Sequence, residues 1–245
     1  MNKMKFNDAS TQAKMRRVAS WYGKKPRIYN ASMPSGWTCP AATDCKAWAD
    51  RISGKITDGK SCQFRCFGAS DEARSREARD QGWSNFDALR MLDSASMAAV
   101  IINSIPADAE IIRVHVRGDF WNQAYFDAWM DAARQFPAIT FYAYTKSLNY
   151  WINGNPPRNF VLTASYGGRW DYLIEENSLK SARVVFSIAE AEDRGLEIDH
   201  DESHAILDHG SFAVLLHGTQ PKGSAAADAR QLLISSGADF SYSKA

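Results

Sequence analysis

The stretch that decides the predicted fold runs from residue 111 to residue 144 and reads IIRVHVRGDFWNQAYFDAWMDAARQFPAITFYAY. It begins with a run of mostly β-branched residues, Ile111–Val116, which predicts a strand. Apolar side chains then recur at helical spacing over residues 122–136, and a proline ends that pattern. A second apolar run follows at Ile139–Tyr144. A strand, a helix and another strand in succession predict a right-handed βαβ unit with parallel strands.

The same alternation continues on both sides of this unit. Further strands are predicted at Arg27–Ser32, Asn159–Ala164, Arg183–Ile188 and Phe212–Leu216, and further helices at Asn85–Ser104, Arg169–Lys180 and Ser224–Ser235. Six strands separated by helices or long crossovers predict an α/β fold with a parallel sheet. Because six units are too few for an eight-stranded barrel, we predict a partial (β/α)6 barrel. An open doubly wound sheet is the alternative.

Length and composition fit one domain in the cytoplasm. The chain has 245 residues, 45% of them hydrophobic, and a net charge of +1, so its bulk charge predicts no polyanionic partner. No apolar run reaches the roughly 20 residues of a membrane span, and no apolar segment of a secretory signal follows the N-terminus. We therefore predict a single α/β domain over residues 27–245, after a basic N-terminal extension over residues 1–26, with no membrane partner.

The N-terminal extension has one local feature of its own. Its basic residues, interleaved with Trp21 and Tyr22, lie in the runs Lys14-Met-Arg16-Arg17 and Lys24-Lys25-Pro-Arg27. Basic residues with aromatic neighbours could bind nucleic acid. A solvated helix and loop leading into the domain is the simpler explanation.

All four cysteines lie between residues 39 and 66, as Cys39-x5-Cys45 and Cys62-x3-Cys66. Such clustering indicates a shared role in two disulfides, a zinc site or an iron–sulfur cluster. Disulfides are rare in the cytoplasm, and a chain of this length does not need them, so metal or cluster ligation is the better interpretation. The spacing alone does not distinguish a zinc site from a cluster. The pair Cys62-x3-Cys66 has the spacing of a zinc knuckle, whereas Cys39-x5-Cys45 is longer than that spacing, and the ferredoxin spacings are absent.

Polar side chains follow the predicted strands at the points where the strands end. In parallel α/β folds the loops after the carboxyl ends of the strands carry the functional groups, so we predict a pocket there, beside the cysteine segment. The candidate catalytic residues, whose side chains can transfer protons, are Asp119, Lys146 and His217. The candidate substrate-binding residues are Arg117, Thr145, Ser165, Tyr166 and Gln220.

Several of these candidates also have a structural explanation. Arg117 could bind a carboxylate or phosphate through two parallel hydrogen bonds, or it could pair with Asp119 across the turn. Lys146 could bind an anion or act as a base, or it could lie on the surface. His217 could be catalytic or structural. An arginine, an aspartate and a lysine at successive strand ends favour a pocket, and their charges favour a small anionic substrate.

Four motifs resemble a phage-encoded family known as gene product 88. They are Thr38-Cys39-Pro40 with Cys45, Phe64-Arg65-Cys66-Phe67, Val114-His-Val-Arg-Gly-Asp-Phe120 and Phe141-Tyr-Ala-Tyr-Thr-Lys146. The similarity spans roughly Arg27 to Thr219. The family is distantly similar to radical S-adenosylmethionine enzymes, which implies a partial barrel and an oxygen-sensitive [4Fe–4S] cluster held by the cysteines at 39, 45, 62 and 66. A phage-encoded chain would act in the cytoplasm of its host.

The resemblance has limits. The Cys-x3-Cys-x2-Cys loop of the radical enzymes is absent, and Arg-Gly-Asp stands in place of Gly-Gly-Glu after the second strand, so the sequence does not support the use of S-adenosylmethionine. If all four cysteines bind the cluster, the cluster transfers electrons or stabilises the fold. If only three ligate, with Cys62 left out, the open iron can act as a Lewis acid in a lyase-like reaction.

Two functions remain open at this point. The first is an iron–sulfur enzyme, lyase-like or radical-type, that acts on a small anionic substrate at the carboxyl ends of the strands. The alternative is a non-catalytic module, stapled by zinc or a cluster, that binds nucleic acid or a host protein.

Overall fold

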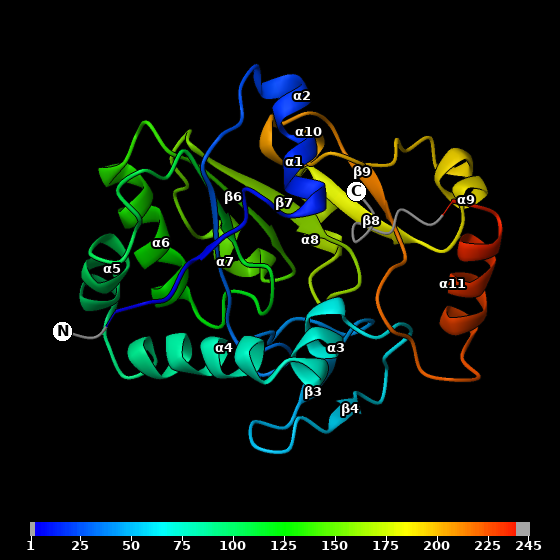
Figure 1. Ribbon diagram of the computed structural model, residues 1–245. Helices are drawn as coiled ribbons and strands as arrows, with labels where there is room; N and C mark the ends of the chain where they lie inside the picture. The colour runs from blue at the N-terminus through cyan, green and yellow to red at the C-terminus, as the bar shows by residue number, and fades with distance from the viewer. Residues whose placement is uncertain (1–2, 239–245) are drawn as a thin grey trace.

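The computed structural model of the chain describes residues 3–238, with a seven-stranded sheet at its centre (Figure 1). In spatial order the strands are β1 (Asn7–Asp8), β2 (Ile28–Ala31), β5 (Ile111–Val114), β6 (Thr140–Thr145), β7 (Phe160–Ser165), β8 (Ser181–Val185) and β9 (Phe212–Leu215). Neighbouring strands from β2 to β9 are parallel, whereas β1 pairs antiparallel with β2. The prediction of an α/β fold with a parallel sheet is confirmed.

The parallel strands follow one another across the sheet in chain order, without reversal. A doubly wound sheet reverses its strand order at a switch point, so the chain does not form that alternative. The sheet does not close into a barrel, because β1 and β9 are its two edges among the described residues.

Helices join the strands and cover the outer face of the sheet, while two short helices at residues 13–17 and 203–206 pack against its inner face (Figure 1). The helices are α1 (Ala13–Arg17), α2 (Ala19–Tyr22), α3 (Phe67–Arg74), α4 (Arg76–Leu89), α5 (Ser94–Ile102), α6 (Gln123–Gln135), α7 (Leu148–Ile152), α8 (Tyr172–Glu176), α9 (Ile188–Asp193), α10 (Ser203–Ile206) and α11 (Ala225–Ser235). On the outer face, Phe141 of β6 packs in one cluster with Trp129 of α6. This cluster is the largest part of the apolar core and fixes the outer layer of the fold.

The opposite face of the sheet curves around an interior. Ile28 of β2 and Phe212 of β9 belong to the same buried cluster, although five strand pairings separate their strands. Ile111 and Tyr142, from the central strands, complete this layer. Since the first and last parallel strands contribute to one cluster, the sheet is strongly curved. These apolar side chains fill the inner side of the sheet at the amino ends of the strands.

Two predicted helices differ from the structure. The helix expected over residues 85–104 is divided into α4 and α5, because the Asp93 side chain accepts a hydrogen bond from the Ser96 N–H and caps a new helix. The helix expected over residues 169–180 is reduced to α8, because Asp171 accepts hydrogen bonds from the two glycine N–H groups before it and holds a turn. In both regions the apolar spacing was helical, but a local aspartate set the boundary.

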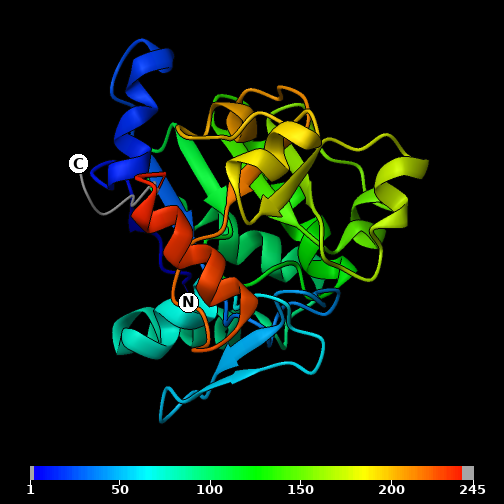
Figure 2. The same ribbon diagram turned by 90° about the vertical axis from the view of Figure 1, so that its right-hand side faces the viewer.

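A small hairpin, β3 (Ala47–Ala49) paired with β4 (Ile56–Asp58), lies within the cysteine segment. The hairpin and the helices α1 and α2 lie at opposite ends of the molecule in both views (Figures 1 and 2). The N-terminal segment packs against the main sheet: β1 pairs with β2, and Met15 and Val18 are buried beside Ile28. Within residues 3–238, no helix is both long enough and apolar enough to cross a membrane.

Candidate functional site

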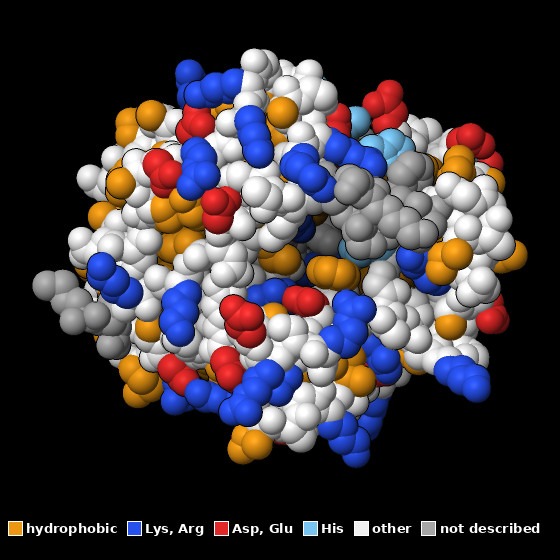
Figure 3. Space-filling model, in the orientation of Figure 1, with side chains coloured by type: hydrophobic (Ala, Val, Ile, Leu, Met, Phe, Trp, Pro, Cys, Tyr) orange, Lys and Arg blue, Asp and Glu red, His pale blue; other side chains and the backbone are white. Residues whose placement is uncertain are grey.

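A cavity of about 1080 Å³ lies on the inner face of the curved sheet. Every parallel strand contributes a side chain to it, and the cysteine segment, α3, the loop after β9, α1 and α11 complete its walls. The surface is hollowed on the face presented in Figure 1, with lysine and arginine side chains around the hollow (Figure 3). The predicted pocket at the carboxyl ends of the strands therefore exists, and it extends deep along their inner face.

The cysteine segment is folded back on itself so that residues far apart in it meet. The β3–β4 hairpin returns the chain toward its start, and Gln63 and Phe64 donate their N–H groups to the carbonyl of Asp44 at 2.7 and 3.1 Å. This return brings Cys45 and Cys66 to one wall of the cavity. Pairwise spacing along the sequence did not reveal this approach, because it depends on the hairpin.

Cys39 lies in a tight turn that a glycine makes possible. Gly36 has φ +72°, and a Cβ there would lie 2.3 Å from the carbonyl oxygen of Ala47. The Gly36 N–H donates to the Cys39 Sγ at 3.3 Å, and Lys46 Nζ donates to the Gly36 and Cys39 carbonyls at 2.6 Å each. Burial raises the pKa of Cys39 to about 12. The turn thus holds this thiol in place from two sides.

Cys45 and Cys66 form a hydrogen-bonded pair of thiols. The hydrogen bond from Cys66, assisted by the charge of Lys146 and opposed by burial, lowers the pKa of Cys45 to about 6. The same hydrogen bond, together with burial, raises the pKa of Cys66. Cys66 directly precedes α3 and is its N-cap residue. The pair therefore favours one thiolate, on Cys45.

Cys62 is hydrogen-bonded to the backbone of the cysteine segment. Its Sγ donates to the carbonyl of Phe64 at 3.1 Å, and burial raises its pKa to about 11. Like Cys39, it is not among the residues that line the cavity, whereas Cys45 and Cys66 are. In the described part of the chain, no three Cys, His, Asp or Glu side chains are arranged as a metal site.

Lys146 and Ser165 lie at the cysteine end of the cavity, as predicted, on the ends of neighbouring strands. Lys146 Nζ donates to Ser165 Oγ at 2.5 Å. Asp119 and Thr145 do not reach the cavity: Asp119 accepts hydrogen bonds from Thr145 Oγ1 at 2.6 Å and from the Lys146 N–H at 2.9 Å. Burial raises the pKa of Asp119. Asp119 and Thr145 therefore fix the end of β6 and position Lys146.

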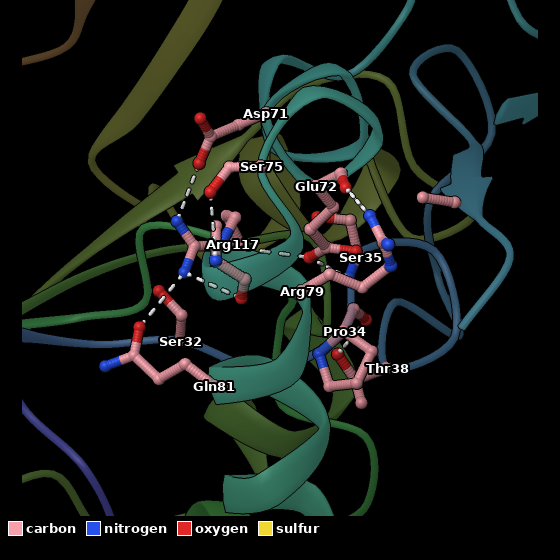
Figure 4. Close-up of polar contacts among 12 residues, drawn as sticks. Ser32, Pro34, Ser35, Thr38, Asp71, Glu72, Ser75, Arg79, Gln81 and Arg117 are labelled. Carbon is pink, nitrogen blue, oxygen red and sulfur yellow. Dashed lines mark hydrogen bonds and ion pairs between the residues drawn. The ribbon is translucent and has the colours of Figure 1, made fainter. Parts of the chain in front are cut away.

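Arg117 also lies outside the cavity, contrary to the prediction that it binds substrate. Figure 4 shows its guanidinium directed toward Asp71 and Gln81. Its guanidinium pairs with Asp71 of α3 at 2.7 Å, approaches Glu72 at 3.8 Å, and donates to Gln81 of α4 at 3.3 Å. Gly118 follows it with φ +82°, where a Cβ would lie 2.5 Å from Thr38 Oγ1. The Arg-Gly-Asp turn therefore ties the sheet to α3, α4 and the segment after β2.

Glu72 beside Arg117 provides a pH-dependent prediction. Burial raises the pKa of Glu72 to about 7 from 4.5. Between pH 4.5 and 7 the folded protein therefore holds a proton on Glu72 that the unfolded chain has released. The contribution of this group to the free energy of unfolding is complete below pH 4.5 and is lost as the pH rises through 7. The decline should be at most about 3 kcal/mol. In Glu72→Gln this pH dependence should disappear, as measured by urea unfolding at pH 5 and pH 8; an equal decline in both proteins would contradict it.

His217 and Gln220 line the cavity, and Tyr166 does not. His217 packs against Phe67, and burial lowers its pKa. Gln220 accepts a hydrogen bond from the Arg65 N–H at 2.7 Å and so joins the loop after β9 to the cysteine segment. Tyr166 instead donates to Glu175 at 2.6 Å and stacks under Arg183. Of the eight predicted catalytic and substrate-binding residues, four line the cavity: Lys146, Ser165, His217 and Gln220.

The sequence analysis missed most of the cations that line the cavity. They are Lys14, Arg16, Arg74, Arg113 and Arg230, and with Lys146 they face a single described carboxylate, Glu202. Burial disfavours the charge of Arg113, yet Glu202, 3.5 Å away, raises its pKa overall. Arg113 had a signal in the sequence, since it is a charged residue inside the apolar run of a central strand. Lys14 and Arg16 belong to the basic N-terminal stretch, but the sequence did not indicate that they line a cavity, and Arg74 and Arg230 had no signal in the sequence.

The fold and the cavity define a mixed α/β protein with a cysteine-walled, cation-lined cavity on the inner face of a curved, mostly parallel sheet. The sequence model of the gene product 88 family matches residues 3–234 of this chain, so the protein belongs to the gene product 88 family. The family prediction made from the motifs is confirmed. No curated protein and no solved structure matches the chain.

Proposed function

We propose that this chain is a phage-type iron–sulfur enzyme of the cytoplasm, in which Cys39, Cys45 and Cys66 hold a [4Fe–4S] cluster. The observation that carries the proposal is that Cys45 and Cys66 form part of the wall of a cation-lined cavity, while Cys39 lies close enough to both for their charges to influence one another. Four thiolates would fill every iron of such a cluster. Three leave one iron open toward the cavity, where a small anionic substrate would bind.

The chemistry of the donor set supports cluster ligation. Cys39 already accepts a backbone N–H group at its sulfur atom, and hydrogen bonds to sulfur are a feature of cluster sites. Cys45 has a thiol with a lowered pKa, and ligands bind metal as thiolates. Because the thiols do not stand in a metal-binding arrangement, their side chains would rotate toward a shared centre when the cluster binds.

When bound, the cluster would supply a Lewis acid or a redox centre. The chain's own residues bind and position the substrate. Lys146 Nζ, held by Ser165, can neutralise an anionic group or carry a proton at the cysteine end of the cavity. Asp119 keeps the Lys146 backbone in place, and His217 offers a second group for proton transfer.

The finer fold assignment is part of the same proposal. We propose a partial (β/α)6 barrel similar to that of radical S-adenosylmethionine enzymes. Its support is the unreversed strand order, the curvature of the sheet and the position of the cysteine segment directly after the first parallel strand. S-adenosylmethionine itself is not included, because the three-cysteine loop that binds it together with the cluster is absent from the sequence.

The alternative, a module that binds nucleic acid through its basic N-terminal stretch, has less support. Three cations of that stretch form ion pairs within the protein: Lys14 with Glu202, Lys24 with Glu110 and Arg27 with Asp108. Lys14 and Arg16 line the cavity rather than an outer surface patch. An ion-paired cation neutralises a phosphate less readily than a solvated one, because its present partner must be released first.

Metal and sulfide analysis of anaerobically purified protein tests the proposal. The expected result is a brown protein with about four irons and four acid-labile sulfides per chain, as a [4Fe–4S] cluster contains. About one zinc per chain, with no sulfide, would instead support a structural zinc site and contradict the iron–sulfur proposal.

A further inference from the structure

The cavity contains a buried amide that the fold does not use. Asn30 lies on β2, its side chain lines the cavity, and the residue is only 3% exposed. Its carboxamide makes no hydrogen bond with any residue among 3–238, although its backbone takes part in the sheet. Its amide opens onto the cavity, so its donors and acceptor are available to a ligand. A ligand that hydrogen-bonds it would explain why it is there.

The nearest strand places a guanidinium beside this amide. Asn30 and Arg113 are register partners on β2 and β5, which lie about 4.8 Å apart, and both side chains line the cavity. Arg113 donates its Nε to the carbonyl of His115 at 3.3 Å and contacts Glu202 at 3.5 Å. A guanidinium has five N–H donors, so these two contacts leave donors for a ligand. Lys14 adds positive charge to the same region.

We infer that Asn30 and Arg113 form a binding subsite for an oxyanion, a carboxylate or phosphate group at one end of the cavity ligand. Arg113 donates to the oxyanion oxygens, and the Asn30 amide donates a further hydrogen bond. The tyrosine ring of Tyr144 forms the adjoining wall, within cation–π distance of Arg113. The inference rests on the proposed function only in taking this cavity as the substrate site.

The subsite also sets the length of the ligand. On β6, Tyr142 is the register partner of Arg113, and Lys146 follows it by four residues. Four residues of parallel strand span about 13 Å. A ligand whose oxyanion lies at Arg113 and whose reacting group lies near Lys146 and Cys45 is therefore elongated, with its two functional ends at opposite ends of the cavity.

Substitution of Asn30 by leucine tests the subsite. Inorganic phosphate and succinate are titrated separately into the purified protein by calorimetry, with neutral succinamide as a control. At least one of the two anions should bind, and Asn30→Leu should weaken that binding about tenfold or more. The same variant should unfold at a urea concentration close to that of the wild type, because the amide that it removes makes no hydrogen bond with residues 3–238. Phosphate alone would identify a phosphate end group, and succinate alone a carboxylate.

Asn85→Leu is the matched control. Asn85 is also buried, but its amide makes hydrogen bonds with the Lys5 N–H and carbonyl and with the Ser32 carbonyl at 2.7 to 3.1 Å. This variant should lose stability and keep its anion affinity. The inference is overturned if neither anion binds the wild type, if Asn30→Leu binds like the wild type, or if Asn30→Leu loses stability as Asn85→Leu does.

Failure of this inference is distinguishable from failure of the proposed function. Anion binding that depends on Asn30 in a protein without iron and sulfide would support the subsite and contradict the cluster. A full complement of iron and sulfide with no effect of Asn30→Leu would do the reverse.

Discussion

Cys66→Ala is expected to lose nearly all bound iron when the variant is purified anaerobically, and Cys39→Ala and Cys45→Ala should do the same. Each substitution removes a thiolate ligand from a cluster that has only three. Mutation of a residue that only hydrogen-bonds to a metal ligand lowers metal affinity roughly 10- to 100-fold, and loss of a ligand itself should lower it more. Iron and sulfide content per chain, with the absorption spectrum near 400 nm, measures the effect.

Cys62→Ala is the control within the same series. Its Sγ is hydrogen-bonded to the Phe64 carbonyl and lies outside the cavity, so this variant should keep its iron, sulfide and colour. The outcome separates three-cysteine from four-cysteine ligation. Loss of iron from all four variants alike would show that Cys62 also ligates and that no iron is open to a substrate.

Arg117→Met is expected to cost about 3–5 kcal/mol in the free energy of unfolding. The guanidinium is 7% exposed and pairs with Asp71 and Glu72, so its removal leaves a buried carboxylate without its cation. The variant should keep its anion affinity while it remains folded, because Arg117 lies outside the cavity. Urea unfolding measures the first effect and calorimetry the second.

A surface ion pair supplies the comparison for Arg117. Arg134 pairs with Asp131 at 2.6 Å, but both side chains are largely exposed, so Arg134→Met should cost less than about 1 kcal/mol. If Arg117→Met is as mild as Arg134→Met and instead abolishes anion binding, the structural role assigned to Arg117 is wrong and the original substrate-binding prediction is restored.

The sequence predicted the elements whose signals are local. Strand β5, helix α6 and strand β6 follow directly from one apolar run, one helical spacing and a second apolar run. The two-residue β1 and the three-residue strands of the β3–β4 hairpin were missed. Strands of that length have no detectable periodicity, and their pairing depends on contacts with segments distant in sequence.

The site was predicted less completely, for a related reason. Lys146 and Ser165 were found because strand ends of a parallel sheet converge. Arg117 also follows the end of a strand, but its side chain pairs with Asp71, 46 residues earlier in the chain, and therefore does not face the cavity. Arg113 and Asn30 were overlooked because both lie within predicted strands, where only the curvature of the sheet shows that their side chains face a cavity.

The most direct test of the central claim is a Mössbauer spectrum of ⁵⁷Fe-enriched protein, recorded without and with an anion that binds the cavity. A cluster held by Cys39, Cys45 and Cys66 predicts one distinct iron site, with about a quarter of the total signal, whose parameters change when the anion binds. Four similar thiolate-ligated sites that do not respond to the anion, or no cluster signal at all, would contradict a three-cysteine cluster open to the cavity.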